Sequence, residues 1–194
     1  MKRIIVAITG ASGAIYGIRA LQMLREAGVE RHLVLSPAAG RTISEETDHS
    51  LDDVRAMADV VHGFRDIGAS IASGSFRVDG MLVAPCSVRT LSGIAHCAAD
   101  ELIVRAADVQ LKERRRVVLL FRETPLHAGH IALMERATLN GAVVMPPVPA
   151  FYHRPKCIDD LVTQTVGRAL DLFGLDLPDV HRWSGQAPRD DDDR

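Results

Sequence analysis

The sequence has few aromatic residues, little net charge and no long apolar run. Aromatic residues make up 4% of its 194 positions, whereas hydrophobic residues make up 47%, so the core must be built mainly from aliphatic side chains. A formal net charge of −2 provides no basic surface for nucleic acid, and no apolar run is long enough to cross a membrane. Length and apolar content therefore predict one folded domain with a substantial core.

The sequence also lacks a disulfide framework and a clear metal motif. Cys86, Cys97 and Cys157 are odd in number and widely spaced, without a CxxC pair, which predicts reduced thiols rather than disulfides or a zinc site. His127 and His130 form an HxxH, but no acid or third ligand stands at metal spacing, so a surface or capping role is favoured and no metal is expected. The apolar run near the N-terminus is too short for a signal peptide, which predicts a cytoplasmic protein.

Short apolar runs alternate with helical patterns along the chain. Strands are expected at 3–9, 31–36, 81–84, 117–121 and 142–145. Helices are expected at 14–27, from 37 onward, near 51–58, at 88–97, at 101–111 and at 158–172. A further helix is expected to follow residues 122–125 and to end at about 139. This alternation predicts a doubly wound, mostly parallel α/β sheet with helices on both faces, Rossmann-like in type. One domain would span residues 1–185, and the acidic tail 186–194 is expected to be disordered.

Polar groups recur where the predicted strands end. They are Gly10-Ala11-Ser12-Gly13, Ser36, Ser87-Val88-Arg89-Thr90, Arg122-Glu123, and the loop that reaches Tyr152. Doubly wound sheets bind ligands beyond the carboxyl ends of their strands. The recurrence of hydroxyls and charges at this one edge therefore predicts a binding site.

The loop from Gly10 to Gly13 leads into a helix. Small residues let the backbone approach a ligand, and free N–H groups with the helix dipole favour phosphate; Ser12 could cap the helix and donate to that anion. The alternative is an ordinary tight turn with a serine cap. The loop is neither GxxxxGK[ST] nor GxGxxG, and the second strand ends in Ser36, where a NAD site would place an acid. FMN needs no such acid, so the pattern favours a mononucleotide flavin.

Cationic residues stand on two later helices. Arg105, Asp108 and Lys112 lie on one helical face, with Asp108 and Lys112 spaced for an ion pair. The basic run 112–116 is typical of a solvated helix end. Arg168 stands in an otherwise apolar helix, where its guanidinium could extend to solvent or bind a second phosphate.

Seven ordered motifs extend this pattern between residues 10 and 155, and the similarity to a known family that they carry covers nearly the whole chain, from residue 3 to about Trp183. They read GASGA at 10–14, Ser36, EETD at 45–48, PCSVRTLSG at 85–93, RAADVQLKERR at 105–115, RETPLH at 122–127 and PAFYHRP at 149–155. On these motifs the sequence strongly resembles the UbiX-type flavin prenyltransferases, formerly labelled aromatic-acid decarboxylases. Their length and order make the match far more specific than a glycine loop alone.

The resemblance implies a metal-independent prenyltransferase. A dimethylallyl group would pass from dimethylallyl monophosphate to reduced FMN, with new bonds at flavin N5 and C6. The product, prenylated FMN, would serve a UbiD-type decarboxylase. Family members form dodecamers with sites between subunits, so a homododecamer is expected, with some residues acting across an interface.

The resemblance also assigns roles to individual residues. FMN would contact Gly10, Ala11, Ser12, Ser36, Ser87, Val88, Arg89, Thr90 and Arg122. Tyr152 and Arg168 would hold the prenyl phosphate, with Lys112 and Arg105 as helpers. Cations at the phosphate oxygens would stabilise the charge that develops as phosphate leaves, which gives Lys112 a catalytic role.

Two further side chains complete these expectations. Glu123 would be catalytic by handling protons at the leaving phosphate and during ring closure, and Ser12 would act close to the flavin. Tyr152 could offer an aromatic face to the allylic cation. Trp183 could do the same, or it could be a terminal packing anchor.

Two positions depart from the family. Ile67 stands where some relatives carry tryptophan, and Pro37 follows Ser36 where lysine is common; neither removes a proposed catalytic group.

Two other functions are open. A non-catalytic carrier of FMN or prenylated FMN would need no second phosphate site. A flavin-dependent cysteine decarboxylase typically has a PASANT-like motif where this chain reads PCSVRT. Both alternatives are disfavoured.

Overall fold

A computed structural model of the chain describes residues 1–178, 180–182 and 185. Trp183 and the tail 186–194, for which the sequence raised expectations, lie outside the described residues. Six strands form one parallel sheet in the order β3-β2-β1-β4-β5-β6. The strands are β1 (Arg3–Ile8), β2 (Glu30–Leu35), β3 (Val60–His62), β4 (Gly80–Cys86), β5 (Arg116–Phe121) and β6 (Val143–Val144).

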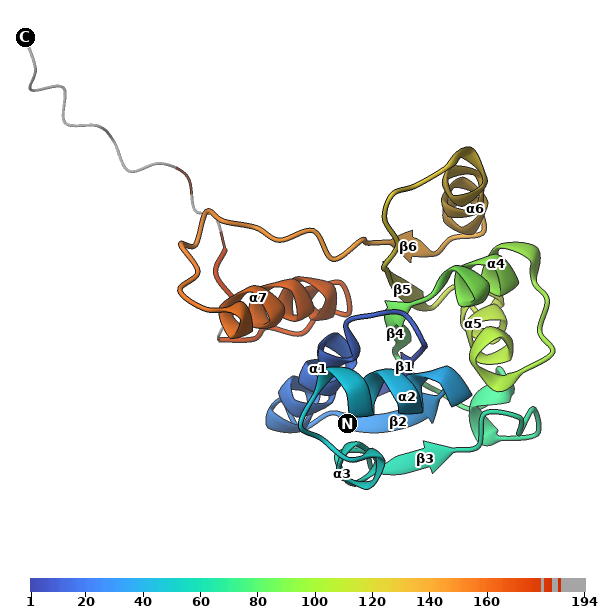
Figure 1. Ribbon diagram of the computed structural model, residues 1–194. Coiled ribbons are helices and arrows are strands. Elements are labelled where there is room, and N and C mark those ends of the chain that lie inside the picture. Colours follow the sequence, from blue (N-terminus) through green and yellow to red (C-terminus); the bar gives the residue numbers. More distant parts are fainter. Residues whose placement is uncertain (179, 183–184, 186–194) are drawn as a thin grey trace, which may run out of the picture.

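Helices connect these strands and cover both faces of the sheet (Figure 1). They are α1 (Ala14–Glu26), α2 (Pro37–Glu46), α3 (Leu51–Ala56), the 3-10 turn η1 (Ser70–Ala72), α4 (Val88–His96), α5 (Leu102–Lys112), α6 (Ala128–Leu139) and α7 (Ile158–Asp171). Among the described residues, no helix combines the length and the apolar character that a membrane span requires.

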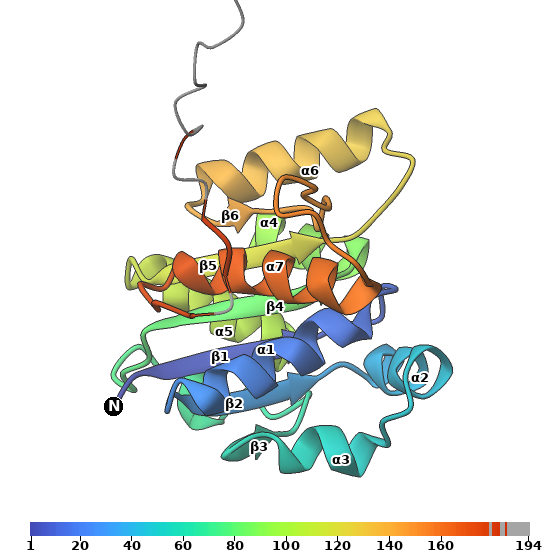
Figure 2. The ribbon, with the colours of Figure 1, turned by 90° about the vertical axis from the view of Figure 1, so that its left-hand side faces the viewer.

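The core consists of two apolar layers separated by the sheet. Alternate residues of β1 point to opposite layers, with Ile4, Val6 and Ile8 in one and Ile5 and Ala7 in the other. The first layer is covered by α1 and α7, together with α2 and α3, and the second by α4, α5 and α6 (Figure 2). Strands that are buried on both sides explain the continuous apolar runs of the sequence, and the predicted doubly wound α/β fold is confirmed.

Two details differ from the predicted elements. The edge strand β3 was not expected, since its exposed Val60 and Val61 lie in a polar stretch. Strand β4 continues through Pro85 to Cys86, with a register irregularity between Val83 and Cys86. This irregularity lies where the chain leaves the sheet for α4, at the edge that carries the candidate site.

Candidate functional site

The candidate site lies where β1 and β4 end side by side. These neighbouring strands are not consecutive in the chain, because β1 leads to β2 on one side and β4 leads to β5 on the other. Thr9 joins the two ends: its buried hydroxyl donates to the Pro85 carbonyl at 2.7 Å and accepts from the Ser87 N–H at 2.8 Å. The two loops that follow are therefore held together at the point where doubly wound sheets bind nucleotides.

The loop after β1 packs tightly against the start of α2. A Cβ atom at Gly10 would lie within 3.0 Å of the Ala38 Cβ atom, so only glycine allows this approach. Gly13 has φ +100°, which favours glycine, and it is the N-cap residue of α1. The N-termini of α1 and α2 therefore converge on this loop.

Glu46, at the last position of α2, caps α1. Its carboxylate accepts hydrogen bonds from the backbone N–H groups of Gly13 at 2.7 Å and Ala14 at 3.3 Å. The expectation that Ser12 caps this helix is wrong. The N-cap residue is Gly13, and the Glu46 carboxylate accepts the hydrogen bonds that a capping serine would accept. Ser12 stays exposed at the loop.

Serines begin helices α2 and α4 at this edge. Ser36 is the N-cap residue of α2, and its hydroxyl accepts from the Ala39 N–H at 3.2 Å. Ser87 is the N-cap residue of α4, where it accepts from the Thr90 N–H at 3.4 Å. The Ser36 hydroxyl can still donate to a ligand, whereas the Ser87 hydroxyl donates to the Thr90 hydroxyl at 3.2 Å. The N–H groups of Ala38 in α2 and of Val88 and Arg89 in α4 have no carbonyl partner within their helices.

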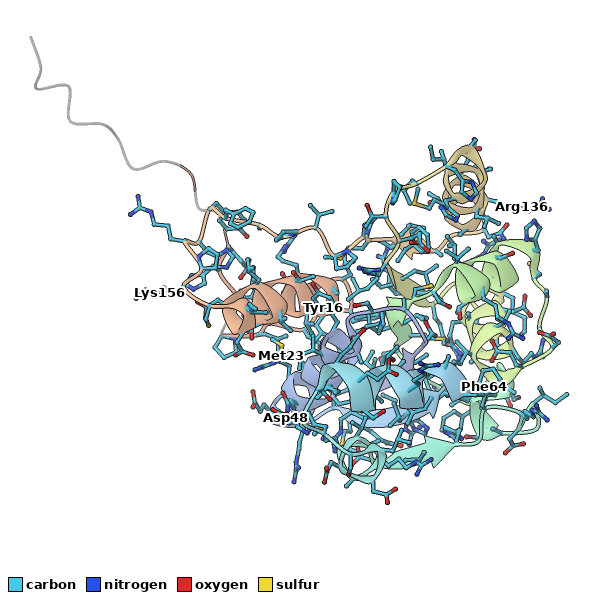
Figure 3. The ribbon with its side chains drawn as sticks, viewed as in Figure 1. Tyr16, Met23, Asp48, Phe64, Arg136 and Lys156 are labelled. Atoms are coloured by element: carbon cyan, nitrogen blue, oxygen red, sulfur yellow. The ribbon has the colours of Figure 1, made fainter. Side chains whose placement is uncertain are left out.

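Charged groups follow β5 at the same edge. The backbone N–H of Arg122 donates to the Cys86 carbonyl at 3.1 Å, which fixes Arg122 beside the end of β4. Glu123 is half-buried, and its carboxylate accepts from the Thr124 N–H at 2.9 Å. Tyr16, labelled in Figure 3, lies in the first turn of α1. Burial raises the pKa of Tyr16, and the charge of Arg122 partly offsets that rise. Tyr16 was not expected from the sequence and lies within the field of Arg122.

Cys86 lies close to this edge but is not suited to act as a nucleophile. Cys86 ends β4 inside the core, and burial raises the pKa of its thiol, so the neutral form is strongly favoured. Cys97 and Cys157 are exposed, and all three cysteines are free. The expectation of reduced thiols stays a prediction.

The capping role that was favoured for the HxxH is confirmed for its first histidine. His127 is the N-cap residue of α6, where its Nδ1 accepts from the Gly129 N–H at 3.0 Å. The His130 ring lies 3.7 Å from the His127 ring, centroid to centroid. Among the described residues, no group of three or more histidine, cysteine, aspartate or glutamate side chains is arranged to hold a metal ion.

The groups predicted to contact FMN therefore share one edge. Loop 10–13, Ser36, the first turn of α4 and Arg122 all follow the carboxyl ends of neighbouring strands. Backbone amides and hydroxyls suit a flavin phosphate, and the guanidinium of exposed Arg122 suits its charge. We call these groups together the cradle. Four of its residues are exposed, namely Gly10, Ser12, Arg89 and Arg122, so in one chain the cradle is open to solvent.

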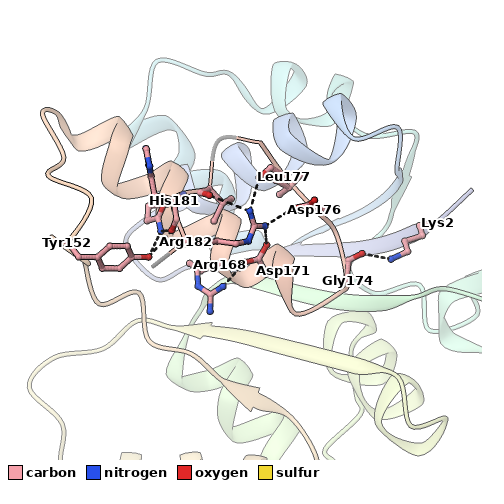
Figure 4. A network of polar contacts seen from close by, with 11 residues as sticks. Lys2, Tyr152, Arg168, Asp171, Gly174, Asp176, Leu177, His181 and Arg182 are labelled. Atoms are coloured by element: carbon pink, nitrogen blue, oxygen red, sulfur yellow. Dashed lines mark hydrogen bonds and ion pairs between the residues drawn. The ribbon is translucent and has the colours of Figure 1, made fainter. Parts of the chain in front are cut away.

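The predicted phosphate ligands lie elsewhere: Arg168 is part of α7, and Tyr152 lies beside this helix (Figure 4). Helix α7 ends over the amino ends of the strands, where Lys2 donates to the Phe173 carbonyl at 2.9 Å. Arg168 lies within one turn of that end and pairs with Asp171 at 2.5 Å. The tyrosine hydroxyl donates to the His181 carbonyl at 2.9 Å.

The other predicted helpers lie on α5. Asp108 pairs with Arg105 at 3.1 Å, and Lys112 pairs with the adjacent Glu113, so the expected pair between Asp108 and Lys112 is wrong. Lys112 ends α5 just before β5 begins, whereas Arg122 follows the opposite end of that strand. A six-residue strand spans roughly 20 Å, so one chain does not bring Lys112 to the cradle.

The sequence matches the Flavoprotein family over residues 1–165. It is 60% identical over 188 residues to the flavin prenyltransferase UbiX of Escherichia coli K12, with 95% of this chain and 100% of the relative covered. It is 56% identical over 188 residues to the flavin prenyltransferase UbiX of Thauera aromatica, with 97% of each chain covered.

Solved structures of UbiX proteins are similar to this chain in fold as well as in sequence. A UbiX protein crystallised with FMN and dimethylallyl pyrophosphate has a TM-score of 0.94 and 54% identity, covering 96% of this chain and 99% of that one. A dodecameric FMN-dependent UbiX-like decarboxylase from Escherichia coli O157:H7 has a TM-score of 0.91 and 50% identity, covering 94% and 100%. The chain belongs to the UbiX flavin prenyltransferase family.

Proposed function

We propose that this protein transfers the dimethylallyl group of dimethylallyl monophosphate to N5 and C6 of reduced FMN and releases phosphate. The observation that carries the proposal is the set of amides, hydroxyls and guanidinium groups beyond β1, β2, β4 and β5. It occurs in a chain that is 60% identical to a flavin prenyltransferase. Reduced FMN, when bound, supplies the nucleophilic atoms, and the residues of this chain bind, orient and exchange protons.

The flavin phosphate is assigned to the N-terminus of α2. Glu46 already occupies the N–H groups of Gly13 and Ala14 at the start of α1, and a second anion there would be repelled. The start of α2 has no such carboxylate in its first turn and lies against Gly10. The Ser36 hydroxyl and the backbone of residues 10–12 would hold the phosphate, and the flavin ring would extend toward Ser87–Thr90 and Arg122.

Departure of phosphate from an allylic carbon needs positive charge at its oxygens and a proton carrier nearby. Arg168 and Lys112, with Arg105 and Tyr152, would bind those oxygens and stabilise the charge that develops on them. Glu123 would hold and release protons at the leaving phosphate and at the reacting carbons. Its carboxylate is anchored by the Thr124 N–H, which leaves other lone pairs for this work.

The complete site would be shared between copies of the chain. Within one chain, Lys112 and the end of α7 lie away from the cradle, near the amino ends of the strands. Apolar side chains are exposed on α6 and on the segment that follows β6, at Ile131, Leu139, Val148, Phe151 and Ile158. Such a surface is typical of a subunit interface, and one relative is described as dodecameric. We therefore propose a homododecamer in which neighbouring copies supply the second phosphate site.

The setting and the partner of this activity follow from its chemistry. Reduced FMN is kept reduced in the cytoplasm, where free thiols such as Cys97 and Cys157 also persist, so we place the protein there. The product is a modified flavin that this reaction does not consume. A UbiD-type decarboxylase would receive it as cofactor.

The reaction is tested by mass spectrometry of the flavin released after anaerobic incubation with reduced FMN and dimethylallyl monophosphate. The expected product is heavier by one C5H8 unit and forms without a divalent metal. A parallel incubation with dimethylallyl diphosphate tests the choice of donor, since one relative was crystallised with that ester. Unmodified flavin with both donors would contradict the proposed reaction and favour a flavin carrier.

The shared site is tested by mixing two inactive variants in one oligomer. Chains carrying Glu123→Gln and chains carrying Arg168→Ala would be co-expressed with different tags and purified together. If each site draws these residues from different copies, random mixing restores about a quarter of the sites. Activity no greater than that of either parent variant would contradict a shared site.

A further inference from the structure

A buried glutamine on α7 bonds the hydroxyl of Tyr152. Gln164 is 3% exposed, and its Nε2 donates to the Tyr152 hydroxyl oxygen at 2.7 Å. The same nitrogen donates to the His181 carbonyl at 2.8 Å, and Gln164 Oε1 accepts from the His181 N–H at 3.0 Å. The segment that carries His181 runs beside α7, and its Arg182 pairs with Asp171 (Figure 4).

The direction of these hydrogen bonds is fixed by chemistry. A backbone N–H can only donate, so the atom that faces the His181 N–H must be the amide oxygen of Gln164. The amide nitrogen therefore faces both the phenol oxygen and the His181 carbonyl, with one hydrogen for each. The phenol oxygen accepts from Gln164, and the phenol proton is directed at the His181 carbonyl at 2.9 Å.

We propose that Gln164 is a positioning residue that holds the Tyr152 hydroxyl as a donor to the prenyl phosphate. When a phosphate oxygen approaches, the phenol proton turns toward it. The His181 carbonyl keeps its bond from Gln164, so no buried acceptor is left unpaired by the turn. The amide also continues to donate to the phenol oxygen, which polarises the hydroxyl and strengthens it as a donor. This inference rests on the proposed function of Tyr152.

The position of Gln164 on α7 supports this role. Arg168 is four residues further along the helix, so the two side chains lie on adjacent turns of one face. Asp171 in turn holds the Arg168 guanidinium. The hydroxyl and the guanidinium are thus each held by a neighbour at one side of α7, where a single phosphate could meet both.

Burial of the Gln164 amide is unfavourable unless its nitrogen and oxygen form hydrogen bonds. A buried amide without partners destabilises the fold, and the neighbouring α7 positions Val162 and Val166 are buried and apolar. Tyr152 is the one side chain among the described residues that Gln164 bonds. An amide at this core position is therefore explained by Tyr152 and the main chain of His181.

The inference is tested by binding of dimethylallyl monophosphate to protein loaded with oxidised FMN, which does not react. Gln164→Met, which keeps the length of the side chain but removes the donor, should raise the Kd about fivefold. The Kd of FMN should stay the same within about twofold. Gln164→Glu, which retains the acceptor for the His181 N–H, serves as a second variant should the first fail to fold. Thr165→Val is the control, since within the described part of the chain the Thr165 hydroxyl bonds only the Leu161 carbonyl of its own helix.

The effect must also pass through Tyr152. In a Tyr152→Phe background, Gln164→Met should cause no further loss of dimethylallyl monophosphate binding. In turnover assays of the single variant, Gln164→Met should raise KM for dimethylallyl monophosphate with little change in kcat. An unchanged Kd, or equal losses with and without the tyrosine hydroxyl, would overturn the inference. Failure of the wild-type protein to prenylate FMN would instead contradict the proposed function, so the two failures are distinguishable.

Discussion

The contact between Gly10 and Ala38 leads to a prediction with a built-in rescue. A methyl group at Gly10 would lie within 3.0 Å of the Ala38 Cβ atom, whereas carbon atoms pack at roughly 3.5–4.0 Å. Helix α2 cannot simply move away, because Ala39 and Ile43 are fully buried. Gly10→Ala should therefore lower the free energy of unfolding by about 1–3 kcal/mol.

The same displacement should weaken FMN binding, because Ser36 and residues 10–12 form the proposed phosphate site. Thermal unfolding should show a melting temperature lower by roughly 3–10 °C, and fluorescence titration should show a raised Kd for FMN. Ala38→Gly removes the opposing methyl group. The double variant should regain FMN affinity and most of the stability, less about 1 kcal/mol for glycine in a helix.

Gly63→Ala is the matched control for this experiment. A Cβ atom there would meet only the Asp66 Cβ atom, at an ordinary 3.7 Å, so stability and FMN affinity should be unchanged. If Gly10→Ala behaves like this control, or if Ala38→Gly gives no rescue, the proposed packing of the loop on α2 is wrong.

Three further substitutions test separate parts of the site and the fold. Glu123→Gln should retain FMN but lose turnover, and normal turnover would refute the proton role of Glu123. Arg168→Ala should raise the Kd of dimethylallyl monophosphate more than that of FMN in calorimetric titrations, whereas equal losses would indicate a structural arginine. The hydrogen bond from Arg31 lowers the pKa of the Asp59 carboxyl from 3.8 to about 2, so the ion pair stabilises the fold above pH 4 and loses its effect as the pH falls toward 2. Asp59→Asn should lower the free energy of unfolding in urea at pH 7 by about 1 kcal/mol, allowing for solvent screening. A loss that stays constant down to pH 3 would contradict this assignment.

The fold was predictable because its strands are buried on both faces. Runs such as residues 3–9 and 117–121 are apolar without alternation, which is typical of parallel strands beneath two helical layers. Strand β3 was not predictable, because it is short and its Val60 and Val61 are exposed at the edge of the sheet. Its place is set by pairing with β2 rather than by burial of its own side chains.

The candidate site was predictable only as an edge of the sheet. Ser36 and Ser87 follow their strands directly, so their place at helix N-termini can be expected from local sequence. Glu46 reaches Gly13 across 33 positions, and no local pattern indicates such a contact. Lys112 was expected to help bind the prenyl phosphate, but α5 runs back along the strands and carries it to the opposite edge of its own chain. The sequence of one chain therefore cannot show which copy it serves.

A crystal structure of the protein with bound FMN tests the central claim most directly. The account predicts the flavin phosphate within hydrogen-bonding distance of the Ser36 hydroxyl and the backbone of residues 10–12, with the ring against Ser87–Thr90. It also predicts that Lys112 or Arg168 of a neighbouring copy faces that ring. A flavin bound at any other part of the chain would contradict the account.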